Sequence, residues 1–223
     1  MTEPYKSQLG IFAKYWEPGQ VKTRLASDTS NLFAARVYQA FLEATLETAS
    51  GLAERQVLAF TPADRVSEFA CCLPPHWTLT TQSGDQLGER MTAYFTEAFE
   101  HDIEKVILIG SDSPHLPREV LQQAFQQLDV HRCVLGPARD GGYYLIGARN
   151  LVPPVFTGID WSTNQVMQQT VEQLQAANIS YGILPTWYDI DTIDDLEELQ
   201  HDLQSSNHWL YTTLQSLRQE HLS

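Results

Sequence analysis

Three of the chain's 14 lysine and arginine residues, Lys14, Lys22 and Arg24, stand within eleven positions of one another. They follow a short apolar run, residues 8–13, which predicts a buried strand. Ligands of open α/β sheets bind beyond the carboxyl ends of strands. Cations in that place suit a phosphate chain, because arginine offers a bidentate fork and lysine a mobile point charge. We therefore expect this loop to bind a nucleotide through Lys14, Pro18, Gly19, Lys22 and Arg24.

A carboxylate follows the most apolar run of the chain, Val106–Ile109. Asp112 stands three residues beyond this run, where its side chain would project among bound phosphates. Magnesium is often held by one or two carboxylates together with substrate phosphates. Asp112 is thus a candidate metal ligand, although it could instead shape the turn before Pro114.

A pair of acidic residues lies in the last quarter of the chain, at Asp189 and Asp191. In extended backbone both side chains point to one side, with Ile190 toward the core. Like charges on one side repel each other unless a cation lies between them. We expect Asp191, and after it Asp189, to complete the metal site. The neighbouring Thr192, Asp194 and Asp195 suit the start of a helix instead.

The segment Arg139–Tyr143 reads Arg-Asp-Gly-Gly-Tyr. Paired glycines permit close approach of the backbone to a ligand, although Asp-Gly is also a common hairpin turn. The adjacent guanidinium and carboxylate favour binding of an acceptor substrate. Arg90 could face the nucleotide or lie on the surface, and His115 has no assigned role. The expected acceptor-binding residues are Arg139, Asp140, Gly141, Gly142 and Tyr143.

Short apolar runs alternate with longer helical patterns along the whole chain, which favours a mostly parallel sheet with helices on both faces. We expect a single α/β domain over residues 1–223, with a carboxyl-terminal helix over 207–223. The predicted strands are 8–13, 56–60, 77–81, 105–110, 132–136, 143–147 and 181–184. The predicted helices are 32–50, 63–72, 87–101, 118–128, 163–177, 193–204 and 208–220.

The composition excludes several classes of protein. The formal net charge is −14, so the chain has no basic excess with which to bind nucleic acid. No apolar run is long enough to span a membrane or to serve as a signal peptide. Three cysteines without metal-ligand spacing fit a reducing compartment. These features predict a cytoplasmic protein, and the apolar residues of the last helix could make it a homodimer.

The clusters together resemble one bacterial family. They are Phe12–Lys14 with Pro18-Gly19 and Lys22–Leu25, Leu87–Met91, Gly110–Pro114, Gly136-Pro137 with Asp140–Tyr143, and Asp189–Thr192. This set resembles the glycosyltransferase-like family within the nucleotide-diphospho-sugar transferase (GT-A) superfamily. More distantly it is similar to phospholactate guanylyltransferase and the molybdenum-cofactor guanylyltransferases.

The resemblance implies a GT-A-type fold, with Mg²⁺ or Mn²⁺ held by Asp112 and Asp191. It implies phosphates at Lys14, Lys22 and Arg24, and an acceptor near Asp140–Tyr143. The first loop departs from the family pattern, because Pro18-Gly19 stands where well-studied nucleotidyltransferases have a glycine-rich turn.

The sequence therefore predicts a metal-dependent transferase that acts on a small-molecule acceptor. In this interpretation Lys22, Arg24 and Asp112 are catalytic. The donor is a nucleoside triphosphate or a nucleotide-sugar. The alternative is a non-catalytic module that binds a nucleotide or sugar phosphate; such a module would not need both acidic clusters.

Overall fold

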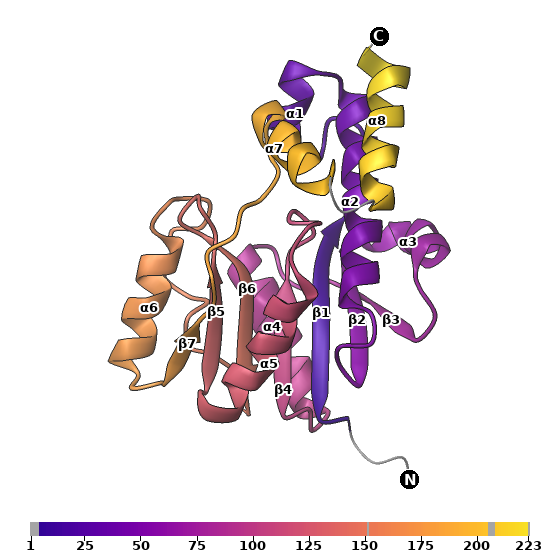
Figure 1. Cartoon of the computed structure of the whole chain (residues 1–223). Helices are drawn as coiled ribbons and strands as arrows, with labels where there is room; N and C mark the ends of the chain where they lie inside the picture. The colour runs from indigo at the N-terminus through magenta and orange to yellow at the C-terminus, as the bar shows by residue number, and fades with distance from the viewer. Residues whose placement is uncertain (1–4, 151, 205–207, 223) are drawn as a thin grey trace.

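The computed structural model describes residues 5–150, 152–204 and 208–222 of the chain. Seven strands form one sheet in the order β3-β2-β1-β4-β6-β5-β7 (Figure 1). Strand β6 is antiparallel to β4 and β5, and the other pairs are parallel. The predicted α/β class with a mostly parallel mixed sheet is confirmed. The strands are β1 Ser7–Lys14, β2 Arg55–Thr61, β3 Trp77–Thr81, β4 Lys105–Ile109, β5 Cys133–Pro137, β6 Tyr143–Arg149 and β7 Tyr181–Ile183.

Strand β4 lies in the middle of the sheet and is buried on both faces. Ile107 and Ile109 pack into one core, while Val106 and Leu108 pack into the other. All four side chains are at most 4% exposed. This two-sided burial explains the continuous apolar run in the sequence.

Two layers of helices cover the sheet. Helices α3 and α5 and the second half of α2 pack on one face, and α4 and α6 pack on the other. The helices are α1 Thr23–Asp28, α2 Asn31–Ala49, α3 Val66–Cys72, α4 Leu87–Glu100, α5 Arg118–Val130, α6 Val166–Ala176, α7 Ile193–Gln204 and α8 Trp209–Leu222, with a 3₁₀ turn at Ala63–Arg65.

A third cluster of helices stands beyond one end of the sheet (Figure 1). It consists of α1, the first half of α2, α7 and α8, and we call it the helical cap. Its own apolar core includes Leu25, Phe33, Leu199 and Leu210, all fully buried. Helices from the first and last quarters of the sequence therefore pack together to build the cap.

The structure differs from the predicted helices in two places. Helix α1 was not predicted, since a six-residue helix carries too short an apolar pattern to be recognised. Helix α6 begins at Val166, three residues later than expected, so Thr163 and Asn164 lie in the preceding loop. The expected last helix is present as α8, while residues 207 and 223 lie outside the described residues. No helix in the described ranges has the length and apolarity needed to cross a bilayer.

Candidate functional site

Three side chains from distant parts of the sequence meet beyond the carboxyl end of β4. The Nζ atom of Lys22 lies 2.5 Å from Oδ1 of Asp112 and 3.0 Å from Oδ1 of Asp191. The expected phosphate-binding lysine thus lies directly between the two expected metal ligands. The structure brings these three predicted residues together, and it places a cation where the sequence analysis expected a metal.

The local backbone explains how Lys22 reaches this position. It caps the amino terminus of α1 in a left-handed conformation, with φ 46° and ψ 48°. Buried Val21 and Leu25 anchor the backbone on either side. The turn is therefore held by packing, while the flexible four-carbon side chain reaches across to the sheet.

The environment of Lys22 favours its charged form. Its side chain is 2% exposed, whereas those of Asp112 and Asp191 are 43% and 42% exposed. Burial alone would lower the pKa of Lys22, but the charges of the two carboxylates raise it above its usual value. A buried ammonium is thus stabilised by two partly exposed carboxylates.

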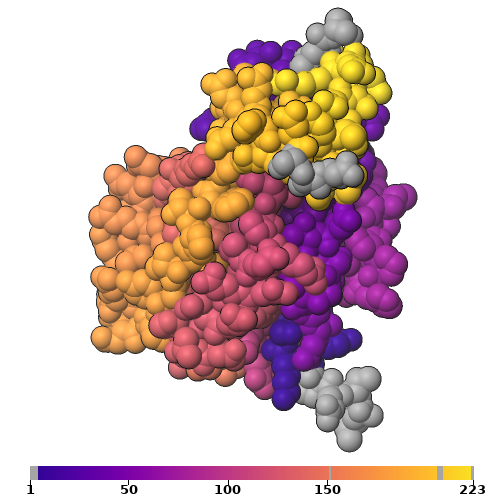
Figure 2. Space-filling view, in the orientation of Figure 1, coloured from indigo at the N-terminus to yellow at the C-terminus, as the bar shows by residue number. Residues whose placement is uncertain are grey.

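The segment between β7 and α7, residues 184–192, carries Asp189 and Asp191 and lies on the molecular surface (Figure 2). We call it the strap. The amide of Ile190 donates to the carbonyl oxygen of Asp112 at 3.0 Å. Oγ of Ser113 donates to Oδ1 of Asp189 at 2.5 Å. These bonds fix the strap against the loop that follows β4, and thereby fix Asp191 opposite Asp112.

Asp189 differs from Asp191 in its surroundings. Burial, and after it the charge of Asp112, raises the pKa of Asp189 to about 6. Its carboxylate accepts a hydrogen bond from Ser113, whereas Lys22 pairs with Asp112 and Asp191. At the end of the strap Asp195 accepts hydrogen bonds from the amides of Asp191 and Thr192, as the predicted helix start requires. Asp189 therefore braces the loop after β4, and Asp191 is the strap carboxylate that meets the cation.

The carboxylates of Asp112 and Asp191 suit a divalent cation. Both already converge on one positively charged atom, and both remain partly open to solvent. Within the described ranges no group of three or more histidine, cysteine or acidic side chains could hold a metal by itself. A metal here would need further oxygen ligands from a substrate, which is the usual arrangement for Mg²⁺ at phosphates.

The other residues of the expected nucleotide loop have varied positions. Arg24 lies in α1, 76% exposed, with its guanidinium 4.0 Å from Asp191. Lys14 donates to the carbonyl oxygen of Gln20 across the loop. Between them Pro18 precedes Gly19, whose φ of +82° favours glycine. Arg24 is thus the loop cation nearest to the carboxylates after Lys22.

Arg90 cross-links the turn that precedes α4. Its guanidinium donates to the carbonyl oxygens of Gly84 and Asp85, and to the side chain of Gln82. Gln82 in turn donates to the carbonyl oxygen of Ala13. These contacts give Arg90 a role in shaping the loops next to β1.

Arg139 and Asp140 are adjacent in sequence but face different surroundings. The Arg139 guanidinium lies 4.1 Å from the ring centre of Tyr188 and 3.0 Å from a carboxylate oxygen of Glu198. Asp140 accepts a hydrogen bond from the amide of Gly142 at 2.9 Å and lines the cavity described next. The structure thus separates the guanidinium from the carboxylate that the sequence analysis expected it to assist.

A cavity of about 540 Å³ extends from the carboxylates toward the loop before α6. Sequence reasoning missed much of its wall, which Leu87, Trp161 and the loop residues 162–164 provide. In the sequence these residues are recognisable only as a leucine at the start of a predicted helix and a tryptophan followed by polar residues. The lining residues are Arg24, Leu87, Asp112, Asp140, Gly142, Tyr143, Trp161, Ser162, Thr163, Asn164, Val166 and Asp191.

His115 lies on the other side of the strap. Its ring packs 5.1 Å from Trp187 and 4.4 Å from Tyr188, measured between ring centres. Both ring nitrogens are buried and have no hydrogen-bond partner in the described structure. Burial lowers the pKa of His115 to about 4, so the ring is neutral near pH 7. This histidine packs beneath the strap and does not reach the cavity.

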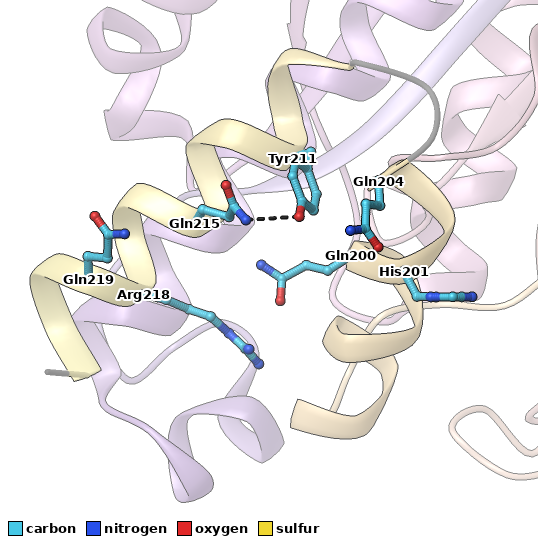
Figure 3. Close-up of a pocket in the computed structure, with 7 residues that line it drawn as sticks. All are labelled: Gln200, His201, Gln204, Tyr211, Gln215, Arg218 and Gln219. Carbon is cyan, nitrogen blue, oxygen red and sulfur yellow. Dashed lines mark hydrogen bonds between the residues drawn. The ribbon is translucent and has the colours of Figure 1, made fainter.

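A second groove, of about 410 Å³, lies within the cap between α7 and α8 (Figure 3). Its lining is rich in glutamine, and Gln215 donates to the hydroxyl of Tyr211. It shares no lining residue with the cavity at the carboxylates.

Comparisons with known proteins show which family and which fold this chain shares. The model of the family "Uncharacterized protein conserved in bacteria (DUF2064)" matches residues 44–163. No curated protein matches the chain. A crystal structure from Desulfovibrio desulfuricans G20, named a "putative nucleotide-diphospho-sugar transferase", is 37% identical, with a TM-score of 0.90 over 96% of this chain and 97% of that one.

More distant structures share the fold. A cytidylyltransferase from Leptospira borgpetersenii is 14% identical with a TM-score of 0.56, over 96% of this chain and 94% of that one. A CMP:2-keto-3-deoxy-manno-octonic acid synthetase, solved with CTP, is 12% identical with a TM-score of 0.54, over 90% and 99% of the two chains. The family match and the 37% identical relative show that this chain belongs to the bacterial DUF2064 family, with the fold of nucleotide-diphospho-sugar transferases.

Proposed function

We propose that this protein is a nucleotide-using transferase that requires Mg²⁺ or Mn²⁺ and acts on a small-molecule acceptor. The observation that carries the proposal is the meeting of Lys22, Asp112 and Asp191 beyond the end of β4. Two carboxylates and a lysine at this point can bind a metal and a phosphate chain together. The fold shared with nucleotide-using transferases supports the same reading.

In the proposed mechanism Asp112 and Asp191 hold the metal, and Lys22 and Arg24 bind the phosphates. When bound, the metal would offset phosphate charge and polarise the reacting phosphoryl oxygens. The Lys22 ammonium leaves the carboxylates and stabilises the negative charge that builds on the leaving phosphates. Positive charge placed where negative charge develops usually supplies the largest part of such catalysis.

Asp140 and the residues around it orient the acceptor in the cavity of about 540 Å³. An acceptor oxygen then attacks in line, either at phosphorus of a nucleoside triphosphate or at the anomeric carbon of a nucleotide-sugar. The first reaction releases pyrophosphate and the second releases a nucleoside diphosphate. The relative with 37% identity carries a name that favours the sugar donor, while the cations of the first loop favour the triphosphate.

We also propose that residues 1–223 work as one domain. Leu210 and Leu214 of α8 are fully buried in the same cluster as Phe33 and Phe41 of α2. Helix α8 thereby supports the cap. Lys22 precedes helix α1 of the cap, and Asp191 precedes helix α7.

A thermal-shift screen tests the proposed function. Purified protein is heated with ATP, GTP, CTP or UTP, or with a nucleoside diphosphate sugar of one of the same four bases. Each ligand is used with and without Mg²⁺. A ligand that binds the native state raises the melting temperature by mass action. We expect a Mg²⁺-dependent rise with one nucleotide class, which then names the donor. The same screen without any shift would contradict the proposal.

A further inference from the structure

The cavity has two chemically different ends. Near the cap it is lined by Arg24, Asp112 and Asp191, which the proposed function assigns to metal and phosphates. Toward α6 it is lined by five side chains that we call the distal subsite. These are Asp140, Tyr143, Trp161, Thr163 and Asn164.

The charge of the distal subsite disfavours an anionic ligand. Asp140 is the only carboxylate among these five side chains, and none of the five is basic. Arg139, which could have balanced that charge, is paired with Glu198 and stacked on Tyr188. The one cation of the cavity lining, Arg24, lies 4.0 Å from Asp191 at the other end. A phosphate or carboxylate placed against Asp140 would meet repulsion and no compensating cation.

Its remaining groups suit hydroxyls. The Asp140 carboxylate can accept hydrogen bonds from a ligand, and the Asn164 amide can both donate and accept. The Thr163 hydroxyl already donates to the carbonyl oxygen of Asp160 and shapes the loop. Trp161 and Tyr143 stand edge to face, with ring centres 6.4 Å apart, and add an apolar surface. Apolar surface with a few well-placed polar groups is the general pattern of small-ligand sites.

Close backbone contacts hold the subsite in place. A Cβ atom on Gly141 would lie 2.3 Å from the carbonyl oxygen of Asn164, and the φ of Gly141 is +91°. A Cβ on Gly88 would lie 2.2 Å from the carbonyl oxygen of Phe156 and 3.0 Å from Nε1 of Trp161. The amide of Met167 also donates to the carbonyl oxygen of Gly141 at 2.9 Å. Glycines thus allow the loop with Trp161 and Asn164 to pack tightly against the turn with Asp140.

We propose that the distal subsite binds an uncharged, hydroxyl-rich group, such as the ring of a sugar or a cyclic polyol. This deepens the proposed function and rests on it, because it names the substrate moiety that lies beside the reacting phosphates. A sugar phosphate acceptor and a nucleotide-sugar donor both contain such a group. A ligand with a second anionic group at its far end does not fit.

Saturation-transfer NMR on the full-length protein tests this proposal without any nucleotide. The uncharged probes are methyl glycosides of common hexoses and pentoses, together with myo-inositol. Glucuronate and choline serve as the anionic and cationic comparison probes. We expect at least one uncharged probe to bind more tightly than glucuronate and choline. The Asp140→Asn and Trp161→Ala variants should each weaken that binding about tenfold, the loss expected for one hydrogen bond to a charged group or one apolar contact surface.

Asp160→Asn is the matched control. Asp160 is the exposed carboxylate next to Trp161 and does not line the cavity. It accepts a hydrogen bond from the side-chain amide of Gln169. Its substitution should leave probe binding unchanged. Melting temperatures of all variants establish that each is folded.

Three outcomes would overturn the proposal: no uncharged probe binds, glucuronate or choline binds more tightly, or Asp140→Asn binds as well as the unaltered protein. Nucleotide binding in the thermal-shift screen is measured separately. Sugar binding without nucleotide binding would therefore reject the proposed function and support the distal subsite. Nucleotide binding without sugar binding would support the proposed function and reject the distal subsite.

Discussion

Two basic side chains contact the strap, Lys22 at Asp191 and His115 at Trp187 and Tyr188, and their surroundings differ. Lys22 is 2% exposed and makes ion pairs with two carboxylates. His115 packs against Trp187 and Tyr188, and neither ring nitrogen has a hydrogen-bond partner in the described structure. The first environment maintains a charge and the second suppresses one. The strap therefore contacts a charged ammonium at Asp191 and a neutral imidazole at Trp187 and Tyr188. Only the first contact can take part in binding a metal or phosphates.

The largest expected effect is on turnover. Asp112→Asn keeps the shape of the side chain but removes the charge that the proposed metal requires. We expect product formation to fall roughly a hundredfold or more, as when one group that stabilises the transition state is removed. Release of pyrophosphate or of nucleoside diphosphate measures it, with the donor named by the screen.

Asp129→Asn is the control for this variant. Asp129 is an exposed carboxylate that pairs with Lys105 at the other end of β4. It should keep the unaltered rate. Equal rates for Asp112→Asn and Asp129→Asn would remove Asp112 from the mechanism.

The second effect concerns Lys22 and the metal. Because its ammonium occupies the point between the two carboxylates, it competes with a divalent cation when no nucleotide is present. Lys22→Met should therefore bind Mn²⁺ about tenfold more tightly than the unaltered protein, an energy of about 1.4 kcal/mol. Titration of free Mn²⁺ by electron paramagnetic resonance measures the affinity.

Lys105→Met provides the comparison for that titration, since Lys105 pairs with Asp129 away from the site. Its Mn²⁺ affinity should not change. Weaker Mn²⁺ binding by Lys22→Met would mean that the lysine supports the metal site and does not compete with it.

The third effect is on stability as a function of pH. Burial, opposed by Asp202 and reinforced by Arg139, lowers the pKa of His115 from 6.5 to about 4. The unfolded chain then binds more protons between these values, so stability is present above about pH 6.5 and is lost as the pH falls toward 4. The contribution is on the order of 3 kcal/mol, at 1.36 kcal/mol for each pKa unit.

Asp189 acts in the opposite sense. Its pKa is raised from 3.8 to about 6, so its contribution is present below 3.8 and is lost as the pH rises through 6. The unaltered protein must therefore be compared with His115→Phe by urea unfolding at several pH values. His115→Phe should lose less stability than the unaltered protein between pH 6.5 and 4. Parallel curves would show that folding does not lower the pKa of His115.

The smallest effect is expected at Arg139. Its ion pair with Glu198 is exposed, and such pairs contribute at most about 1 kcal/mol. Arg139→Gln should change the Michaelis constant for the acceptor less than twofold, whereas Asp140→Asn should raise it about tenfold. Acceptor titrations of both variants decide this, and a large effect of Arg139→Gln would return the guanidinium to the acceptor site.

The sequence predicted the elements of the sheet well. Continuous apolar runs such as Val106–Ile109 mark strands buried on both faces, and all seven predicted strands are present. It could not predict α1, because six residues with one buried leucine carry little periodic signal.

The sequence was less informative about how the site residues meet. It indicated that Lys22 and Asp112 lie beyond strand ends and that Asp191 lies in extended backbone before a helix, but not that the lysine lies between the carboxylates. That contact depends on the left-handed turn at Lys22 and on the strap bond from Ile190 to Asp112. Likewise, only the fold shows that Arg139 turns to Tyr188 and Glu198 while Asp140 lines the cavity.

In the proposed mechanism Asp112 and Asp191 exchange Lys22 for a divalent metal when a nucleotide binds. A crystal structure with Mn²⁺ and the nucleotide named by the screen tests it through the anomalous signal of manganese. We predict a manganese peak within about 2.2 Å of an oxygen of each carboxylate, with the Lys22 ammonium moved onto the phosphates. A manganese peak elsewhere, with Lys22 still between Asp112 and Asp191, would contradict the claim.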